Sequence, residues 1–354
     1  MKKYFILLFL VCLFVSTVVC EEFTGEITSE HYSGQILTSL TLTDCTINFG
    51  SATNFQIGDD AVVTINGTVT ANSYRTGSAL FNLLGNATFT GSGKIVSAAG
   101  QVIINDMQNT SHRTNRKLTI SGITIESQEN GQTITSIGTC IELKNGAKII
   151  SASTTSSVVQ MRYGATFSME AGCSLDGAET ALVLYDGGSA NITGGTIRGK
   201  SYGVRFSNAN NNTSVNSLAM TGGSVSGEVY GISYGKAGAT SFAYGTVTLG
   251  GSATVGEGNI HIGNNKKITI QDGWTGTAGV TCATEPTSNS PVTVTEDGEN
   301  IASVKTTSSN YPKFTKQLYL GTPTASGGYG TNADYGIRMK SDGTIQIYTL
   351  NTAN

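Results

Sequence analysis

Short apolar segments separated by glycine-rich turns recur along most of the chain. They are clearest between Gly187 and Gly273, where three similar blocks follow one another: GGSANITGGTIRGKSYGVRF, NSLAMTGGSVSGEVYGISY and YGTVTLGGSATVGEGNIHI. Within a segment such as Val204-Arg205-Phe206, apolar and polar residues alternate, which places successive side chains on opposite faces of a β-strand. Each block therefore predicts three short strands joined by two turns.

The segments align into three series when each is anchored on its central apolar residue. The first series runs Ile65, Phe89, Ile120, Ile149, Phe167, Ile192, Met220, Leu249 and Ile270. The second comprises Val69, Ile95, Ile123, Leu175, Ile197, Val225 and Val255, with no clear member after Ile149. The third is Leu80, Val102, Ile141, Val159, Leu182, Val204, Ile232 and Ile260.

Three strands in a repeat of about 25 residues predict an all-β fold, a right-handed parallel β-helix with three sheets, about eight or nine coils and terminal caps. No coil buries its apolar residues alone, so the stacking of neighbouring coils supplies the core. A β-sandwich is the main alternative, but its strands recur about every 8–12 residues without a longer repeat. The longer repeat favours the β-helix.

Glycine pairs mark the predicted bends between strands. They are Gly194-Gly195, Gly222-Gly223 and Gly250-Gly251, and glycine suits a sharp bend because it adopts positive φ without steric cost. Three polar segments lengthen the repeat, namely residues 105–117, 126–138 and 208–216. They are predicted to project from the solenoid as loops.

The two ends of the chain differ from the repeats. Lys2 and Lys3, followed by an uncharged apolar run to Cys20, predict a secretory signal peptide over residues 1–20, with a retained anchor or a lipid attached to Cys20 as alternatives. Residues 21–50 are predicted to form an N-terminal cap and residues 51–273 the β-helix. All four prolines follow Trp274, so residues 274–354 are interpreted as a C-terminal cap or a small appended β-region. The expected location is secreted, extracellular or cell-surface associated, with no membrane span in the mature chain.

The blocks GGTIRGKSYGVRF and GGSVSGEVYGISY resemble the coils of pectin-lyase-like right-handed β-helix proteins. The resemblance is to adhesin-like surface proteins with Gly-Gly-Thr-Ile-type repeats in particular, and it covers residues 40–280 approximately. It implies a secreted or surface-displayed protein, often adhesive or glycan-binding. Polysaccharide lyases and glycoside hydrolases share this fold, so the resemblance also supplies an enzymatic alternative.

Composition adds a surface made of hydroxyl and amide groups. Charged residues make up 13% of the chain and there are 45 glycines, whereas typical domains carry roughly 25% charged residues. The formal net charge of −3 indicates neither nucleic acid nor any other partner. Cys45, Cys140, Cys173 and Cys282 remain after signal-peptide removal, and they allow two disulfides in any of three connectivities or else buried free thiols. Their spacing suits no metal site, and no cofactor is indicated.

Two patterns for catalysis are incomplete. Gly58-Asp59-Asp60 matches one motif of polygalacturonase-like hydrolases, but that family's partner motifs are missing, and adjacent aspartates before a strand are common turn formers. Pectate-lyase-like chemistry needs several acidic calcium ligands on neighbouring coils. The histidines His31, His112 and His261 are scattered. A basic cluster of His112, Arg113, Arg116 and Lys117 suits either an anionic glycan or a solvated loop.

The outward positions of the third series form the candidate binding column. They are Glu142, Gln160, Val183, Arg205, Ser233 and His261. Only one is acidic, which argues against a calcium cage. The column is polar, and Tyr202, Tyr230 and Tyr234 lie nearby as stacking faces for sugars, with an ordinary solvated sheet face as the alternative.

Six Asn-X-Ser/Thr sequons mark glycosylation sites if the secretory pathway is eukaryotic. They are Asn66, Asn86, Asn109, Asn191, Asn211 and Asn212. The sequence as a whole predicts a secreted, non-enzymatic, adhesin-like protein or extracellular surface component, with a glycan or a host or neighbouring cell surface as partner. A purely structural role is a third class, because Thr64, Thr88, Thr119 and Thr248 fall in similar register.

Overall fold

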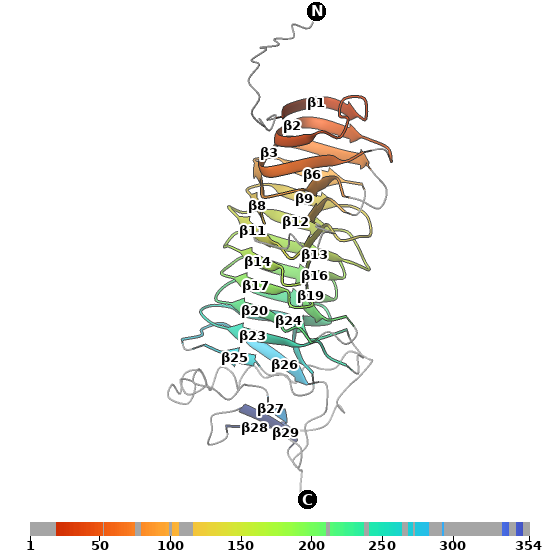
Figure 1. Ribbon diagram of the computed structural model, residues 1–354. Helices are drawn as coiled ribbons and strands as arrows, with labels where there is room; N and C mark the ends of the chain where they lie inside the picture. The colour runs from red at the N-terminus through yellow and green to blue at the C-terminus, as the bar shows by residue number, and fades with distance from the viewer. Residues whose placement is uncertain are drawn as a thin grey trace, which may run out of the picture.

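The described part of the chain is a single long stack of β-strands. The computed structural model describes residues 19–51, 53–74, 79–98, 101–105, 116–209, 213–236, 241–263, 268–271 and 273–282, and beyond them only the backbone of three short strands. Every regular element in these residues is a strand. The stacked strands pair in parallel, coil upon coil, as a right-handed parallel β-helix of about eight turns (Figure 1). The predicted fold class is confirmed.

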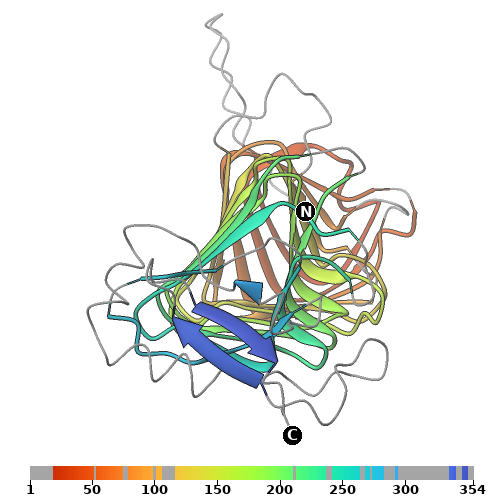
Figure 2. The same ribbon diagram turned by 90° about the horizontal axis from the view of Figure 1, so that it is seen from below.

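Three parallel sheets form the three faces of the stack, and Figure 2 shows them around a common interior. Sheet 1 contains β5 (Ala87–Gly91), β8 (Lys117–Ser121), β11 (Cys140–Lys144), β14 (Thr166–Met169), β17 (Ser189–Ile192), β20 (Asn216–Met220), β23 (Gly245–Leu249) and β25 (Ile268–Ile270). Sheet 2 contains β6 (Lys94–Ser97), β9 (Thr124–Ser127), β12 (Lys148–Ser151), β15 (Ser174–Gly177), β18 (Thr196–Gly199) and β21 (Ser224–Gly227). Sheet 3 contains β4 (Phe81–Leu83), β7 (Ile103–Asn105), β10 (Ile134–Ile137), β13 (Ser157–Arg162), β16 (Thr180–Tyr185), β19 (Tyr202–Ser207) and β22 (Tyr230–Ser233). The nine-residue strand β24 (Thr254–Ile262) continues from sheet 2 into sheet 3, and β26 (Ala278–Cys282) pairs with it.

The N-terminal end is built from long strands that bend around the corners of the coil. They are β1 (Cys20–Thr28), β2 (Ile36–Asn48) and β3 (Phe55–Ser73), and successive parts of β3 pair with β4, β5 and β6. Because β1 and β2 also pair in parallel, residues 21–50 continue the stack. Tyr32, between β1 and β2, is buried with its ring centroid 5.9 Å from that of Phe49 and 5.0 Å from that of Phe55. These rings fill this end of the core.

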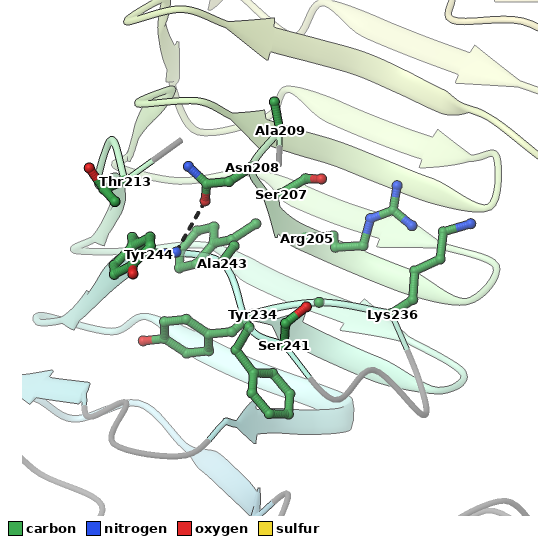
Figure 3. Close-up of a pocket in the computed structure, with 13 residues that line it drawn as sticks. Arg205, Ser207, Asn208, Ala209, Thr213, Tyr234, Lys236, Ser241, Ala243 and Tyr244 are labelled. Carbon is green, nitrogen blue, oxygen red and sulfur yellow. Dashed lines mark hydrogen bonds between the residues drawn. The ribbon is translucent and has the colours of Figure 1, made fainter. Parts of the chain in front are cut away.

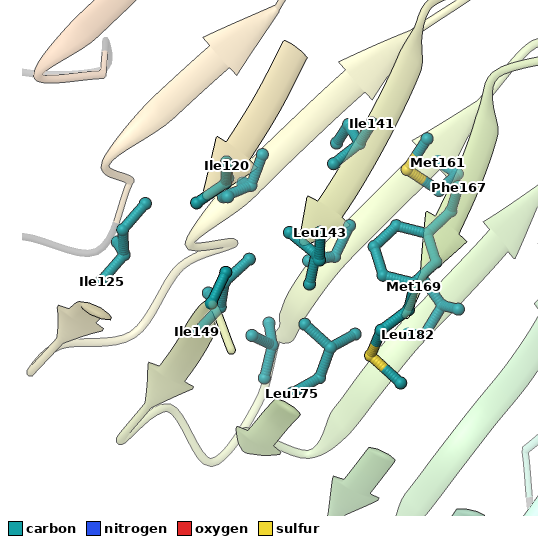
Figure 4. Packing of buried hydrophobic residues seen from close by; sticks show 14 of the residues in the cluster. Ile120, Ile125, Ile141, Leu143, Ile149, Met161, Phe167, Met169, Leu175 and Leu182 are labelled. Atoms are coloured by element: carbon teal, nitrogen blue, oxygen red, sulfur yellow. The ribbon is translucent and has the colours of Figure 1, made fainter. Parts of the chain in front are cut away.

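The core consists of columns of inward side chains, in which each residue is paired to its equivalent on the next coil, and one column from each sheet shows the pattern. The sheet 1 column is Phe89, Ile120, Leu143, Met169, Ile192, Met220, Leu249 and Ile270. The sheet 2 column is Ile95, Ile125, Ile149, Leu175, Ile197, Val225 and Val255. The sheet 3 column is Phe81, Ile103, Ile134, Val159, Leu182, Val204, Ile232 and Ile260. All are buried, which stabilises the fold by about 1.5–3 kcal/mol for each Ile or Leu, and Figure 4 shows columns meeting in the interior.

One predicted loop contains a strand, and this shifted part of the predicted alignment. Residues 126–138 include β10 (Ile134–Ile137), and buried hydroxyl groups lie within it at Thr135 and Ser136 and just before it at Thr133. Because this segment is mostly polar, Ile134 was not recognised as the sheet 3 residue of that coil. Ile141 was therefore assigned to the third series and Ile149 to the first. Ile141 belongs to sheet 1 and Ile149 to sheet 2. Smaller register errors affect Ile65, Phe167 and Ile123, which lie two residues from the true column positions, and Leu80 and Val102, which lie one residue away.

The corner between sheets 1 and 2 explains the glycine pairs. Gly195, Gly223 and Gly251 have φ values of +84°, +76° and +52° on successive coils. A Cβ on Gly223 would lie 2.6 Å from the carbonyl oxygen of Gly195 on the coil before. Glycine is therefore needed both for the left-handed backbone and for the close approach of the coils.

The last coil of the stack contains the single tryptophan of the chain, between β25 and β26. Trp274 is 1% exposed, and its indole Nε1 donates a hydrogen bond of 2.8 Å to the carbonyl of Ala253. Beyond residue 282, β27 (Val292–Thr293) and β28 (Tyr335–Met339) each pair antiparallel with β29 (Ile345–Thr349).

Candidate functional site

Five of the six predicted column residues do lie on adjacent strands of sheet 3. The pairing runs Gln160, Val183, Arg205, Ser233 and His261 from β13 to β24. The column is not a solvated face throughout, because Val183 is 2%, Ser233 0% and His261 8% exposed.

Glu142 does not belong to this column. It lies on β11 in sheet 1, between Thr119 and Ser168, because the strand of its coil that faces Gln160 is β10. Its carboxylate lies 2.7 Å from Lys117 Nζ and 3.0 Å from Lys144 Nζ. Burial acts to raise the pKa of Glu142, but the hydrogen bonds from the two lysines outweigh it and lower the pKa. Glu142 is thus a charged partner in a surface ion-pair network.

Arg205 is the charged centre of the sheet 3 face. Its guanidinium carbon lies 5.5 Å from the ring centroid of Tyr202, and Nη1 is 3.8 Å from a carboxylate oxygen of Glu179. That separation is too long for a hydrogen bond, and Nε and Nη1 of Arg205 are buried without hydrogen-bond partners. Burial lowers the pKa of Arg205, and the charge of Glu179 partly offsets this. Glu179 also pairs with Lys236 Nζ at 3.2 Å.

An aromatic stack continues from Arg205 toward the C-terminal end. The rings of Tyr202 and Tyr230 lie 6.1 Å apart, and Tyr230 stacks on His261 at 4.2 Å with an interplanar angle of 11°. Phe242 lies 5.9 Å from His261. Burial in this stack lowers the pKa of His261 to about 4, so its ring is neutral at neutral pH.

A cavity of about 710 Å³ opens beside this stack (Figure 3). Its residues come from the turns after β19 and β22 and from the ends of those strands: Arg205, Phe206, Ser207, Asn208, Ala209, Thr213, Tyr234, Gly235, Lys236, Ser241, Phe242, Ala243 and Tyr244. Two cations, several hydroxyl and amide groups and aromatic rings therefore converge on one space.

A buried asparagine holds the two walls of the cavity together. Asn216 is 0% exposed, and its Nδ2 lies 3.1 Å from Asn208 Oδ1 and 2.9 Å from the carbonyl of Tyr244. Asn208 Oδ1 also accepts a hydrogen bond of 3.1 Å from the backbone N–H of Tyr244 (Figure 3). These hydrogen bonds hold the turn after β19 against the segment before β23, and so fix the two walls relative to each other.

Several residues of the cavity and its charged surroundings were not predicted. Glu179, Lys236 and Phe242 lie in turns, outside the strand series on which the column was based. Tyr202 and Tyr230, which were predicted as stacking faces, lie beside Arg205 and His261 respectively. Of the three predicted tyrosines, Tyr234 is 0% exposed and forms an inner wall of the cavity.

The other candidate residues lie elsewhere. Asp59 Oδ1 and Asp60 Oδ1 accept hydrogen bonds from the backbone N–H and the side chain of Asn86, at 2.8 and 3.0 Å, and both residues lie within β3, where Asp60 has a φ of +53°. His31 lies near the N-terminal end, bonded to Thr28. Arg116 Nη1 donates to the carbonyl of Leu84, whereas His112 and Arg113 lie outside the described residues.

The sequons differ in their surroundings. Asn191 is exposed on β17, whereas Asn66 and Asn86 are half-buried with their amides bonded to Thr43 and Asp60. Asn109, Asn211 and Asn212 lie outside the described residues. Occupancy of these sites stays a prediction.

The thiols and threonines complete the comparison with the sequence. Cys45, Cys140 and Cys173 are free thiols, and the side chain of Cys282 is outside the described residues.

The threonines of sheet 1 fall into two separate pairs. Thr88 pairs with Thr119 and Thr248 with Thr269, but four other residues lie between the two pairs on the same face: Glu142, Ser168, Asn191 and Ala219. No continuous threonine array forms on this face.

Fold and site together define a parallel β-helix protein with a cavity on its third sheet. Comparison with known proteins adds no closer assignment, because the chain matches no protein-family profile, no curated protein and no solved structure. The part of the chain that the structure describes holds no helix long and apolar enough to cross a membrane. It also holds no group of three or more His, Cys, Asp or Glu side chains placed to share a metal ion.

Proposed function

We propose that this chain is a secreted, non-enzymatic, adhesin-like β-helix protein whose third sheet binds a glycan of an extracellular or cell-surface partner. The observation that carries the proposal is the cavity beside Arg205. It combines aromatic rings, hydroxyl and amide groups and a guanidinium group with two buried nitrogens that lack hydrogen-bond partners.

Each of these groups suits a sugar. The faces of Tyr244 and Phe242 present apolar area to the C–H face of a pyranose ring. Ser207, Asn208 and Ser241 offer donors and acceptors for its hydroxyl groups. Arg205 supplies charge-assisted donors, which form stronger hydrogen bonds than neutral ones. The cavity volume of about 710 Å³ lies in the range of about 300–1,000 Å³ that is usual for small-ligand pockets.

Secretion and surface display rest on the first twenty residues and on the resemblance of the repeats. The low charge and the hydroxyl-rich composition are compatible with a protein that works outside the cell.

The experiment is a glycan-array screen of the purified mature protein and three variants. Tyr244→Ala removes a ring that is 45% exposed, and Lys236→Gln removes a cation whose side chain is 61% exposed, so both changes spare the core. We expect each to weaken binding to the glycans that the wild type selects by roughly tenfold, the effect of losing about 1.4 kcal/mol. Glu142→Gln, on sheet 1, is the matched control and should leave binding unchanged.

A different result would favour the enzymatic alternative. If the protein depolymerised pectin, alginate or a similar polyanionic glycan, and Glu142→Gln or Arg205→Lys abolished the activity, the non-enzymatic proposal would be wrong. If the array gave no binding, or if binding survived both cavity variants, the cavity would not be the glycan site.

A further inference from the structure

A second aromatic cluster lies on the same face, two coils before the cavity. The guanidinium carbon of Arg162, at the end of β13, lies 5.1 Å from the ring centroid of Tyr163 and 4.9 Å from that of Tyr185. The two tyrosine rings meet edge to face at 6.4 Å. Arg162 Nη2 is 3.3 Å from the Tyr163 hydroxyl, and its Nε is buried without a hydrogen-bond partner.

Tyr163 is displayed toward solvent at a cost in backbone energy. Its φ is +53°, a left-handed conformation that glycine adopts freely and a tyrosine does not. Its side chain is among the few large apolar ones that are exposed, at 37%. Strained backbone positions cluster at active sites and ligand clamps, which makes this exposed ring a candidate for recognition.

The cluster is continuous with the cavity. Arg162 pairs with Tyr185 on the next coil, and Tyr185 pairs with Ser207, which lines the cavity. Neighbouring strands lie about 4.8 Å apart, so the path from Arg162 to Ser207 is about 10 Å long. A single sugar held in the cavity does not span this distance, whereas a glycan chain lying along the helix axis does.

We propose that Arg162, Tyr163 and Tyr185 form a second subsite, which takes further sugar units of a glycan chain whose end lies in the cavity beside Arg205. The subsite rests on the proposed function, because it extends the same binding face. It makes the ligand an oligosaccharide or polysaccharide and sets the direction in which the chain lies on the protein.

The test is the dependence of affinity on chain length. Binding is measured by calorimetry with ladders of two to eight sugar units prepared from a neutral β-glucan, from chitin and from a polyuronate. The wild type should bind longer members of the selected ladder about five- to tenfold more tightly than the disaccharide, an increment typical of one added aromatic contact. Tyr163→Asn should remove this increment and leave disaccharide binding unchanged, because asparagine keeps the left-handed backbone without the ring.

Two controls separate the subsite from folding and from the cavity. Tyr163→Phe keeps the ring and should keep the length dependence, and the urea midpoints of both variants should match the wild type within error. Tyr244→Ala, in the cavity, should weaken every length equally.

The possible failures are distinguishable. If Tyr244→Ala weakens binding while Tyr163→Asn leaves the length dependence intact, the second subsite is refuted and the cavity site stands. If affinity does not depend on length, the subsite is likewise refuted. If no ladder and no array glycan binds the wild type, the proposed function is wrong and the subsite with it.

Discussion

Replacing Gly223 by alanine tests whether the close approach of coils, or only backbone conformation, requires glycine at the corner between sheets 1 and 2. Gly223 has a φ of +76°, and a Cβ there would lie 2.6 Å from the carbonyl oxygen of Gly195. That oxygen already accepts a 2.9 Å hydrogen bond from the backbone N–H of Ser224, so it cannot move freely. Gly164 has nearly the same φ, +77°, but a Cβ there would meet nothing within 4 Å. Gly164→Ala is therefore the matched control.

The expected costs follow from these two geometries. Both variants pay about 1–2 kcal/mol for placing a Cβ in the left-handed region, reduced by about 0.4–1 kcal/mol because alanine has less freedom in the unfolded chain. Gly164→Ala should thus lower the free energy of unfolding by about 1 kcal/mol. Gly223→Ala adds a steric overlap in a close-packed stack, which typically costs about 1–3 kcal/mol more. We expect the difference between the two variants to lie in that range.

Urea unfolding provides the measurement, with two probes followed together. The single tryptophan, Trp274, is buried at the last coil and reports that end of the stack by fluorescence. Far-ultraviolet circular dichroism reports the strands as a whole, and coincident transitions would justify a two-state free energy. Equal losses for Gly164→Ala and Gly223→Ala would refute the role given to coil contact. Backbone conformation alone would then explain the glycine.

Two further predictions concern buried titratable groups. Burial disfavours the charged ring of His261 and lowers its pKa to about 4, against 6.5 for an exposed histidine. Between these two pH values the unfolded chain binds more protons than the folded chain. The free energy of unfolding therefore falls as the pH is lowered from about 6.5 to about 4. The loss is at most on the order of 3 kcal/mol. In the His261→Phe variant, the free energy of unfolding measured with urea should depend less on pH in this range. An unchanged dependence on pH would contradict the prediction. Burial, reinforced by the charge of Asp44, raises the pKa of Cys45 to about 11. A thiol reagent at pH 8 should therefore modify Cys45 only after the protein is denatured. Rapid labelling of Cys45 in the folded protein, detected by mass spectrometry, would contradict this prediction.

The sequence predicted the fold because the stacking of coils repeats one physical requirement. Ile197, Val225 and Val255 occupy equivalent positions on three coils, and each must be apolar to bury the next. The prediction failed locally at β10, where the hydroxyl groups of Thr135 and Ser136 are buried with hydrogen bonds to Gln101 on the coil before and to Thr139. Hydroxyl groups satisfied in this way look polar in sequence and behave as interior residues in the structure.

The candidate site was only half predictable for a related reason. Arg205 and His261 lie on regular strands, so their spacing placed them correctly on one column. Glu179, Lys236 and Phe242 reach the same face from turns, whose geometry depends on backbone conformation that the repeat does not encode. The apparent acid of the column, Glu142, was placed there only because β10 had been missed.

The length of the corner between sheets 3 and 1 decides where the cavity lies. The corner is short after β13 and β16, where Thr166 and Ser189 begin the next strands, and long after β19 and β22, where the next strands begin at Asn216 and Gly245. Two long turns on adjacent coils form the walls of the cavity, whereas the two turns before them are short and lie beside the half-buried side chains of Arg162 and Tyr185. Strand pairing on both sides fixes all four corners relative to one another. A regular solenoid with unequal corners therefore places a cavity two coils after the Arg162, Tyr163 and Tyr185 cluster, which is the arrangement that the proposed second subsite requires.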